Sequence, residues 1–141
     1  MRILLGITGG IAAYKAANLI RGLSELGHEV KVIPTENALR FIGKPTLESL
    51  SGHAIETDMY QDVAQVRHVE LGQQADLILI APATANTLSK MANGNCDNLL
   101  IATYLSAKCP VYFAPAMDLD MYKHPSTLAS FSALKSFGNT M

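Results

Sequence analysis

The stretch Ala75–Thr87, with the sequence ADLILIAPATANT, decides the fold. Within it, Leu77–Ala81 is an unbroken apolar run with neither a helical nor an alternating period, which is typical of a strand buried on both faces of a parallel sheet. The strand is expected to end at Pro82, and a helix pattern over Leu88–Ala92 follows a few small or polar residues. Ligands of open α/β sheets bind outside the carboxyl ends of strands, so this loop is a candidate binding site. An ordinary capped strand–helix turn would use the same residue types, and that alternative stays open.

Composition favours a single α/β domain over residues 1–141, with a sheet that is buried on both faces. Of the 141 residues, 49% are hydrophobic and 16% are charged, and the net charge is −1. The nearly neutral charge argues against nucleic acid or an anionic membrane as a partner. Cys96 and Cys109 have no paired or metal-ligand spacing, which predicts reduced thiols, no metal site and a cytoplasmic protein. Lys15 and Arg21 interrupt the apolar amino end, so neither a signal peptide nor a membrane span is expected.

A βαβ unit with glycine in its first turn is predicted for the amino end. An apolar run over Arg2–Ile7 meets Thr8-Gly9-Gly10, and a helix pattern over Ile11–Leu26 leads to a second strand at Val30–Ile33. The glycine spacing does not match the G-x-G-x-x-G pattern of dinucleotide folds, although Glu36 keeps that alternative open. A glycine turn at a helix N-terminus better suits a single phosphate. The glycines could also serve only to let the helix pack closely on the sheet.

Four strand ends carry loops of this small or polar kind, after Ile7, Ile33, Ala81 and Phe113. Together they predict a doubly wound parallel sheet, flavodoxin-like or Rossmann-like, in a three-layer sandwich with a site at one sheet edge. After the last helix pattern, which Gly138 ends, another strand is expected, so the domain looks cut short at its carboxy end.

Four stretches of the sequence carry a resemblance to a known family. They are Gly6-Ile-Thr-Gly-Gly-Ile-Ala-Ala-Tyr-Lys15, Ala81-Pro-Ala-Thr-Ala-Asn-Thr87 with Cys96-Asp-Asn-Leu-Leu100, and Pro115-Ala-Met-Asp-Leu-Asp-Met-Tyr122. With them the chain resembles the flavin-containing cysteine decarboxylase superfamily, and within it the phosphopantothenoylcysteine decarboxylases. The resemblance covers nearly the whole chain and implies a single FMN-binding flavoprotein domain.

The resemblance implies noncovalently bound FMN. By the family pattern, Gly9, Gly10 and Ile11 lie against the cofactor, and Thr35 and Asn37 lie near its phosphate. The family's flavin-binding loop matches Thr84, Ala85, Asn86 and Thr87.

The implied reaction converts phosphopantothenoylcysteine to phosphopantetheine in coenzyme A biosynthesis. The flavin oxidises the cysteinyl thiol to a thioaldehyde, which then loses carbon dioxide. The reduced flavin finally returns the hydride to the decarboxylated product. His68 matches the catalytic histidine, and Met117 and Asp118 match the loop that holds the substrate carboxylate. The family usually has Asn where this chain has Asp118, and an ionised Asp would repel a carboxylate unless it were protonated or paired. Family members also have a flap that covers the substrate and often a cysteine that acts as an acid. Both would lie beyond the end of this chain, so this fragment could bind flavin without turnover.

The resemblance also implies partners and leaves alternatives. The family forms homotrimers, or higher assemblies of trimers, and in bacteria a phosphopantothenate–cysteine ligase domain usually follows at the carboxy end, which this chain lacks. The alternatives are a noncatalytic, regulatory FMN-binding flavoprotein and a flavin prenyltransferase of related fold.

Overall fold

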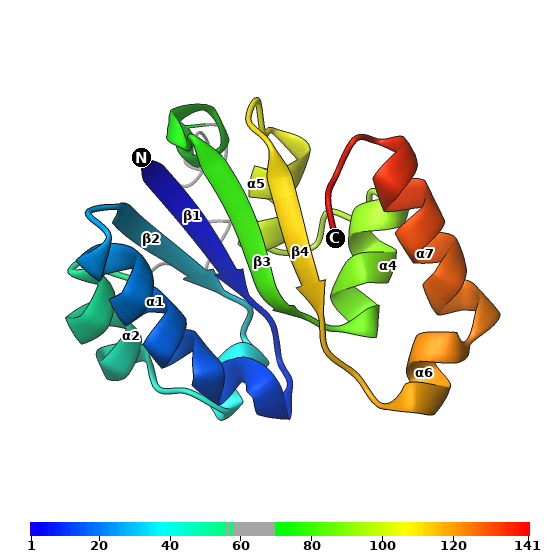
Figure 1. Cartoon of the computed structure of the whole chain (residues 1–141), viewed down its shortest axis with the longest axis horizontal. Helices are drawn as coiled ribbons and strands as arrows, with labels where there is room; N and C mark the ends of the chain where they lie inside the picture. Colours follow the sequence, from blue (N-terminus) through cyan, green and yellow to red (C-terminus); the bar gives the residue numbers. More distant parts are fainter. Residues whose placement is uncertain (56, 58–69) are drawn as a thin grey trace.

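The computed structural model describes residues 1–55, 57 and 70–141. Its centre is a four-stranded, all-parallel sheet with the strand order β2-β1-β3-β4, as Figure 1 shows. The strands are β1 (Arg2–Ile7), β2 (Glu29–Pro34), β3 (Leu77–Ala83) and β4 (Val111–Pro115). The predicted doubly wound parallel sheet is therefore confirmed.

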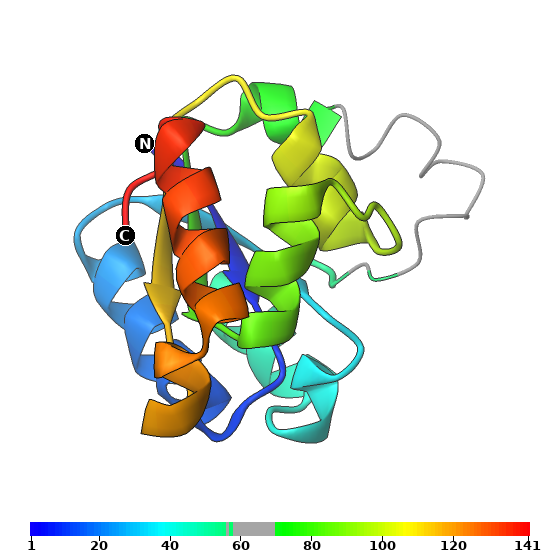
Figure 2. The ribbon, with the colours of Figure 1, turned by 90° about the vertical axis from the view of Figure 1, so that its right-hand side faces the viewer.

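Helices cover both faces of the sheet because neighbouring residues of each strand point to opposite faces. In β1, Leu5 packs into a core that it shares with Ile20 of α1 (Ala16–Glu25) and Leu47 of α2 (Lys44–Ser51). Leu4 packs into a second core. That core includes residues of α4 (Ala85–Asn93), α5 (Leu99–Leu105) and α7 (Pro125–Ser136), and Figure 2 shows α4 and α7 side by side.

Three of the remaining elements are short. They are the 3₁₀ helices η1 (Ile11–Lys15) and η2 (Ala38–Arg40), and helix α6 (Leu119–Lys123). A parallel bridge joins Tyr112 to Thr140 on the outer edge of β4, with Phe113 N–H donating to Thr140 O at 2.9 Å. Within the described ranges, no helix combines the length and apolar character needed to span a membrane.

Several predicted boundaries were wrong. β3 continues through Pro82, whose peptide bond with Ala81 is cis, to Ala83, and its pairing with β4 becomes irregular between Ile80 and Ala83. The first helix begins as the 3₁₀ turn Ile11–Lys15 after Gly10, which supplies no side-chain cap, and becomes α-helical only at Ala16. Asn98, not Asp97, caps α5, since its Oδ1 accepts from Ile101 N–H at 2.8 Å.

Two further predictions concern the segment before β3. The expected strand over 54–59 falls largely outside the described residues, and those of it that are described form no strand. The expected helix over 66–71 falls outside them as far as residue 69, and residues 70–74 are helical.

Candidate functional site

A cavity of about 920 Å³ lies at the carboxyl edge of the sheet. This volume is in the range of small-molecule and cofactor sites. Its walls come from the segments that follow all four strands, together with the amino end of α5. The parallel strands bring these segments together, because all their carboxyl ends meet at one edge.

The turn after β1 is shaped by Gly9. A Cβ at this position would lie 2.4 Å from Asn37 Nδ2 and 2.7 Å from Asn37 Cβ, so the backbone of the turn lies directly against that side chain. At Gly10 a Cβ would meet only Thr84 Cγ2, at an ordinary 3.6 Å. Of these two glycines, only Gly9 has to lack a side chain, because its backbone lies against Asn37. This contact packs the turn after β1 against the segment after β2.

Thr8 joins the turn after β1 to the end of β3. The buried Thr8 hydroxyl donates to Pro82 O at 2.6 Å and accepts from Thr84 N–H at 3.0 Å. Thr84 then caps α4, because its Oγ1 accepts from Thr87 N–H at 3.3 Å. Thr8 thus fixes the relative positions of two pocket walls from a site behind them.

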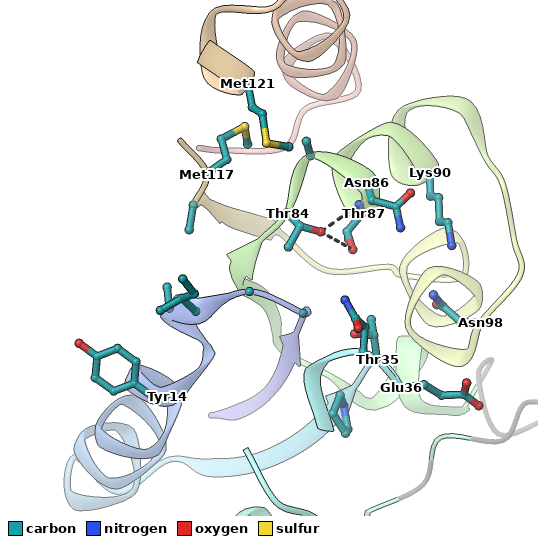
Figure 3. A pocket seen from close by; sticks show the side chains of 18 of the residues that line it. Tyr14, Thr35, Glu36, Thr84, Asn86, Thr87, Lys90, Asn98, Met117 and Met121 are labelled. Atoms are coloured by element: carbon teal, nitrogen blue, oxygen red, sulfur yellow. Dashed lines mark hydrogen bonds between the residues drawn. The ribbon is translucent and has the colours of Figure 1, made fainter. Parts of the chain in front are cut away.

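The pocket has a donor-rich side and an apolar side, which Figure 3 separates. Thr35, Asn86, Lys90 and Asn98 lie on one side, and Tyr14, Met117 and Met121 lie across the pocket from Lys90 and Asn98. Within the described part of the chain, the side-chain amides of Asn37 and Asn86 form no hydrogen bond, so their donors are free for a ligand. This division suits a ligand that is polar at one end and flat and apolar at the other.

Asp118 lies at the apolar side, at the start of α6. Its Oδ1 accepts from Met121 N–H at 2.8 Å, and the side chain is exposed. Tyr122 packs on Phe131 of α7 with 5.1 Å between ring centroids, which holds α6 beside the pocket. The sequence left open whether this Asp is protonated or paired. In the structure, its carboxylate is paired with a backbone N–H.

Comparisons with known proteins agree with this geometry. The Flavoprotein family model matches residues 1–141. The chain belongs to the Flavoprotein family. It is 45% identical to a probable phosphopantothenoylcysteine decarboxylase of Streptococcus mutans, over 97% of this chain and 79% of that protein.

Two further relatives extend the comparison. The chain is 53% identical to the coenzyme A biosynthesis bifunctional protein CoaBC of Mycolicibacterium smegmatis over 97% of its own length, and it spans about a third (33%) of that relative. The crystal structure of the FMN-dependent cysteine decarboxylase SpaF superposes with a TM-score of 0.93 at 33% identity, over 99% of this chain and 82% of that one. The resemblance drawn from the motifs is confirmed.

Nearly all predicted site residues meet in this flavoprotein pocket. All eleven of them that the structure describes line it: Gly9, Gly10, Ile11, Thr35, Asn37, Thr84, Ala85, Asn86, Thr87, Met117 and Asp118. The predicted catalytic residue His68 lies outside the described residues.

Sequence reasoning missed other lining residues, among them the polar side chains of Tyr14, Lys90 and Asn98. For Lys90 a signal existed, because it follows Asn86 by four positions and so lies on the same face of α4. Asn98 was overlooked because Asp97 beside it is an equally good capping residue.

Proposed function

We propose that this chain binds FMN in the pocket and acts as a phosphopantothenoylcysteine decarboxylase in coenzyme A biosynthesis. One observation carries the proposal: eleven residues that match the family's cofactor and substrate motifs, from four separate strand ends, line one cavity. The printed functions of relatives support it, since one is a probable phosphopantothenoylcysteine decarboxylase and another is an FMN-dependent cysteine decarboxylase.

The residues present fit FMN. Gly9 leaves room for close approach of the backbone, and a Cβ there would collide with Asn37. Thr35, Asn37 and Asn86 offer neutral donors on one side of the pocket, as a phosphate and a ribityl chain need. Met117 and Met121 offer soft apolar contacts for a flat ring on the other side. When bound, FMN would supply the oxidation of the cysteinyl thiol and the return of the electrons.

We assign the chain's own residues three tasks. The turn at Gly9, Gly10 and Ile11 and the segment Thr84–Thr87 would hold and orient the cofactor. Met117 and Asp118 would face the substrate, with Asp118 Oδ1 already engaged by Met121 N–H. His68 is proposed as the acid–base group of the decarboxylation half-reaction, on the motif alone.

We also propose a homotrimer. Ile11 and Tyr14 line the pocket and yet are 82% and 59% exposed, and Leu119 and Met121 at the start of α6 are exposed as well. Apolar surface of this kind at a pocket rim is typical of a subunit contact. Sedimentation of the FMN-loaded protein at micromolar concentration checks the oligomeric state, and a clean monomer would contradict it.

Reconstitution with FMN followed by product analysis tests the function. The loaded protein should show a flavin spectrum and release carbon dioxide from phosphopantothenoylcysteine, with phosphopantetheine identified by mass. His68→Asn should keep the spectrum and lose turnover about a hundredfold or more. Asn86→Leu should lose the flavin and keep the fold by circular dichroism.

Three outcomes would count against the proposal. Wild-type protein that binds no FMN would refute the pocket assignment, as would an Asn86→Leu variant that holds FMN at wild-type stoichiometry. Bound FMN without turnover would instead favour the noncatalytic flavoprotein.

A further inference from the structure

An ion pair forms part of the pocket wall between α4 and α5. Lys90 Nζ lies 2.9 Å from Asp97 Oδ2, and both residues line the pocket. The two partners differ in exposure: the Lys90 side chain is 24% exposed and the Asp97 side chain is 59% exposed. The lysine is thus held in the wall, whereas its carboxylate partner is largely in water.

Lys90 lies among neutral donors. It follows Asn86 by one turn of α4, and Figure 3 shows its side chain on the same side of the pocket as Asn86 and Asn98. Asn98 uses its Oδ1 to cap α5, so its Nδ2 remains as a donor. An ammonium group with amide donors on the same side of the pocket suits an anion.

Besides the Lys90–Asp97 pair, the donor-rich side carries one more charge, Glu36. Its side chain is exposed, and Figure 3 shows it beyond Asn98 as seen from Lys90. Lys15 Nζ lies 5.9 Å from the ring centroid of Tyr14, which lies across the pocket from Lys90. Asp118 Oδ1 accepts from the N–H of Met121, which lies at the apolar side. Among the described lining residues, Lys90 is therefore the cation of the donor-rich side.

We propose that Lys90 is the counter-ion of the FMN phosphate and makes the pocket selective for phosphorylated flavin over riboflavin. In this assignment Asp97 holds the ammonium group while the pocket is empty, and the phosphate takes its place when the cofactor binds. The inference rests on the proposed function, since it concerns the same cofactor in the same pocket.

The exchange is energetically reasonable. Asp97 is exposed, so separating the pair costs little, as is usual for ion pairs at the surface. A phosphate carries more charge than a carboxylate and forms charge-assisted hydrogen bonds, which are about twice as strong as neutral ones. The amides of Asn86 and Asn98 can donate to the phosphate as well, whereas they add nothing to the Lys90–Asp97 pair.

Dissociation constants for FMN and riboflavin, measured by quenching of flavin fluorescence, test the proposal. Lys90→Gln should weaken FMN binding by about 10- to 100-fold, because a hydrogen bond to a charged group is lost, and should leave riboflavin binding unchanged. Lys90→Arg should restore most of the preference for FMN. Asp97→Asn should tighten FMN binding by about two- to fivefold, since it removes a competing exposed carboxylate.

The expected changes in FMN affinity have opposite signs in the Lys90 and Asp97 variants. This difference distinguishes a role in charge recognition from a purely structural role of the ion pair. If the pair only tethered the loop before α5, both substitutions would weaken both flavins alike, and that result would overturn the proposal. So would an unchanged FMN-to-riboflavin ratio in Lys90→Gln. Lys135→Gln, with the same charge change near the end of α7, is the matched control. Failure of the wild-type chain to bind FMN at all would refute the proposed function instead.

Discussion

Two strand–helix junctions meet at the pocket, and they are built differently. After β3, Thr84 closes the junction with its own side chain, which accepts from Thr87 N–H and so satisfies the first turn of α4. After β1, Gly10 begins η1 with no side-chain cap, and Gly9 lies directly against Asn37. Thr8 joins the two junctions by hydrogen bonds to Pro82 O and from Thr84 N–H.

The difference lies in what each junction offers a ligand. A junction that is capped by its own side chain leaves fewer backbone donors for a ligand. The glycine junction keeps its N–H groups uncapped and carries no side chains of its own at Gly9 and Gly10, so a ligand can approach its backbone. We infer that the β1 junction meets the ligand with its backbone, whereas the β3 junction meets it with side chains such as Asn86.

The largest expected effect comes from adding one methyl group to the glycine junction. Gly9→Ala would place a Cβ 2.4 Å from Asn37 Nδ2 and 2.7 Å from Asn37 Cβ, so Asn37 or the turn must move. We expect FMN affinity to fall at least about tenfold, and the free energy of unfolding to fall by about 1–3 kcal/mol, as overpacking usually costs. Flavin titration and chemical denaturation measure the two quantities.

Gly10→Ala is the matched control. Its Cβ would make an ordinary 3.6 Å contact with Thr84 Cγ2, and the φ of −160° at Gly10 is open to any residue. It should therefore bind FMN nearly as the wild type does. Equal losses in the two variants would contradict the assignment of the close approach to Gly9.

The next effect concerns the link between the junctions. Thr8→Val keeps the shape of a buried side chain but removes the acceptor for Thr84 N–H and one of two donors to Pro82 O, the other being Thr8 N–H at 3.3 Å. We expect the free energy of unfolding to fall by about 1–2 kcal/mol, in the range for partly buried polar groups left without a partner. Urea denaturation measures it.

Thr103→Val provides the comparison for Thr8→Val. Thr103 is equally buried, but its hydroxyl only donates to Leu99 O, a carbonyl within α5. Its loss should cost about half as much or less, because no backbone N–H loses a partner. A larger loss in Thr103→Val would show that the Thr8 bonds contribute little.

The sequence predicts the glycine junction better than the capped one. Apolar runs located all four strands, because a strand buried on both faces needs continuous apolar residues. The passage of β3 through Pro82 was not predictable, since it depends on tertiary pairing with Thr8 that lies 74 positions away. Helix α6 was missed because five residues give too short a pattern to reveal a period.

The candidate site shows the same limit. Motif residues from the four strand ends were all placed together, since a parallel sheet gathers its carboxyl ends. Lys90 could be placed on the same helix face as Asn86, but its position in the wall also depends on how α4 rotates against the sheet and on the ion pair with Asp97. Sequence patterns predict which residues share one face of a helix or strand. Which charged side chains reach a pocket depends on how these elements pack against one another.

The smallest effect on stability is expected at the amino ends of β1 and β3, at the opposite end of the strands from the pocket. Asp76 Oδ2 accepts from Arg2 N–H at 2.7 Å. This bond lowers the pKa of Asp76 below its ordinary value; desolvation opposes it, and the nearby Arg2 guanidinium adds a lesser lowering. A lowered pKa in the folded state stabilises the protein above the unfolded-state pKa of about 4, and the stabilisation is lost as the pH falls through the folded-state value. Asp76→Asn should therefore lower the Tm slightly at pH 7, and the difference from wild type should shrink towards pH 3.

Arg2→Gln shows which contact matters. It removes the guanidinium but keeps the backbone N–H that donates to Asp76, so most of the pH dependence should survive. FMN affinity should be unchanged in both variants, because the pair lies at the amino ends of β1 and β3, away from the pocket. If Asp76→Asn weakened FMN binding as Gly9→Ala does, the two edges of the sheet would not be independent. The contrast between the two junctions would then fail, because a disturbance anywhere in these strands would reach the ligand.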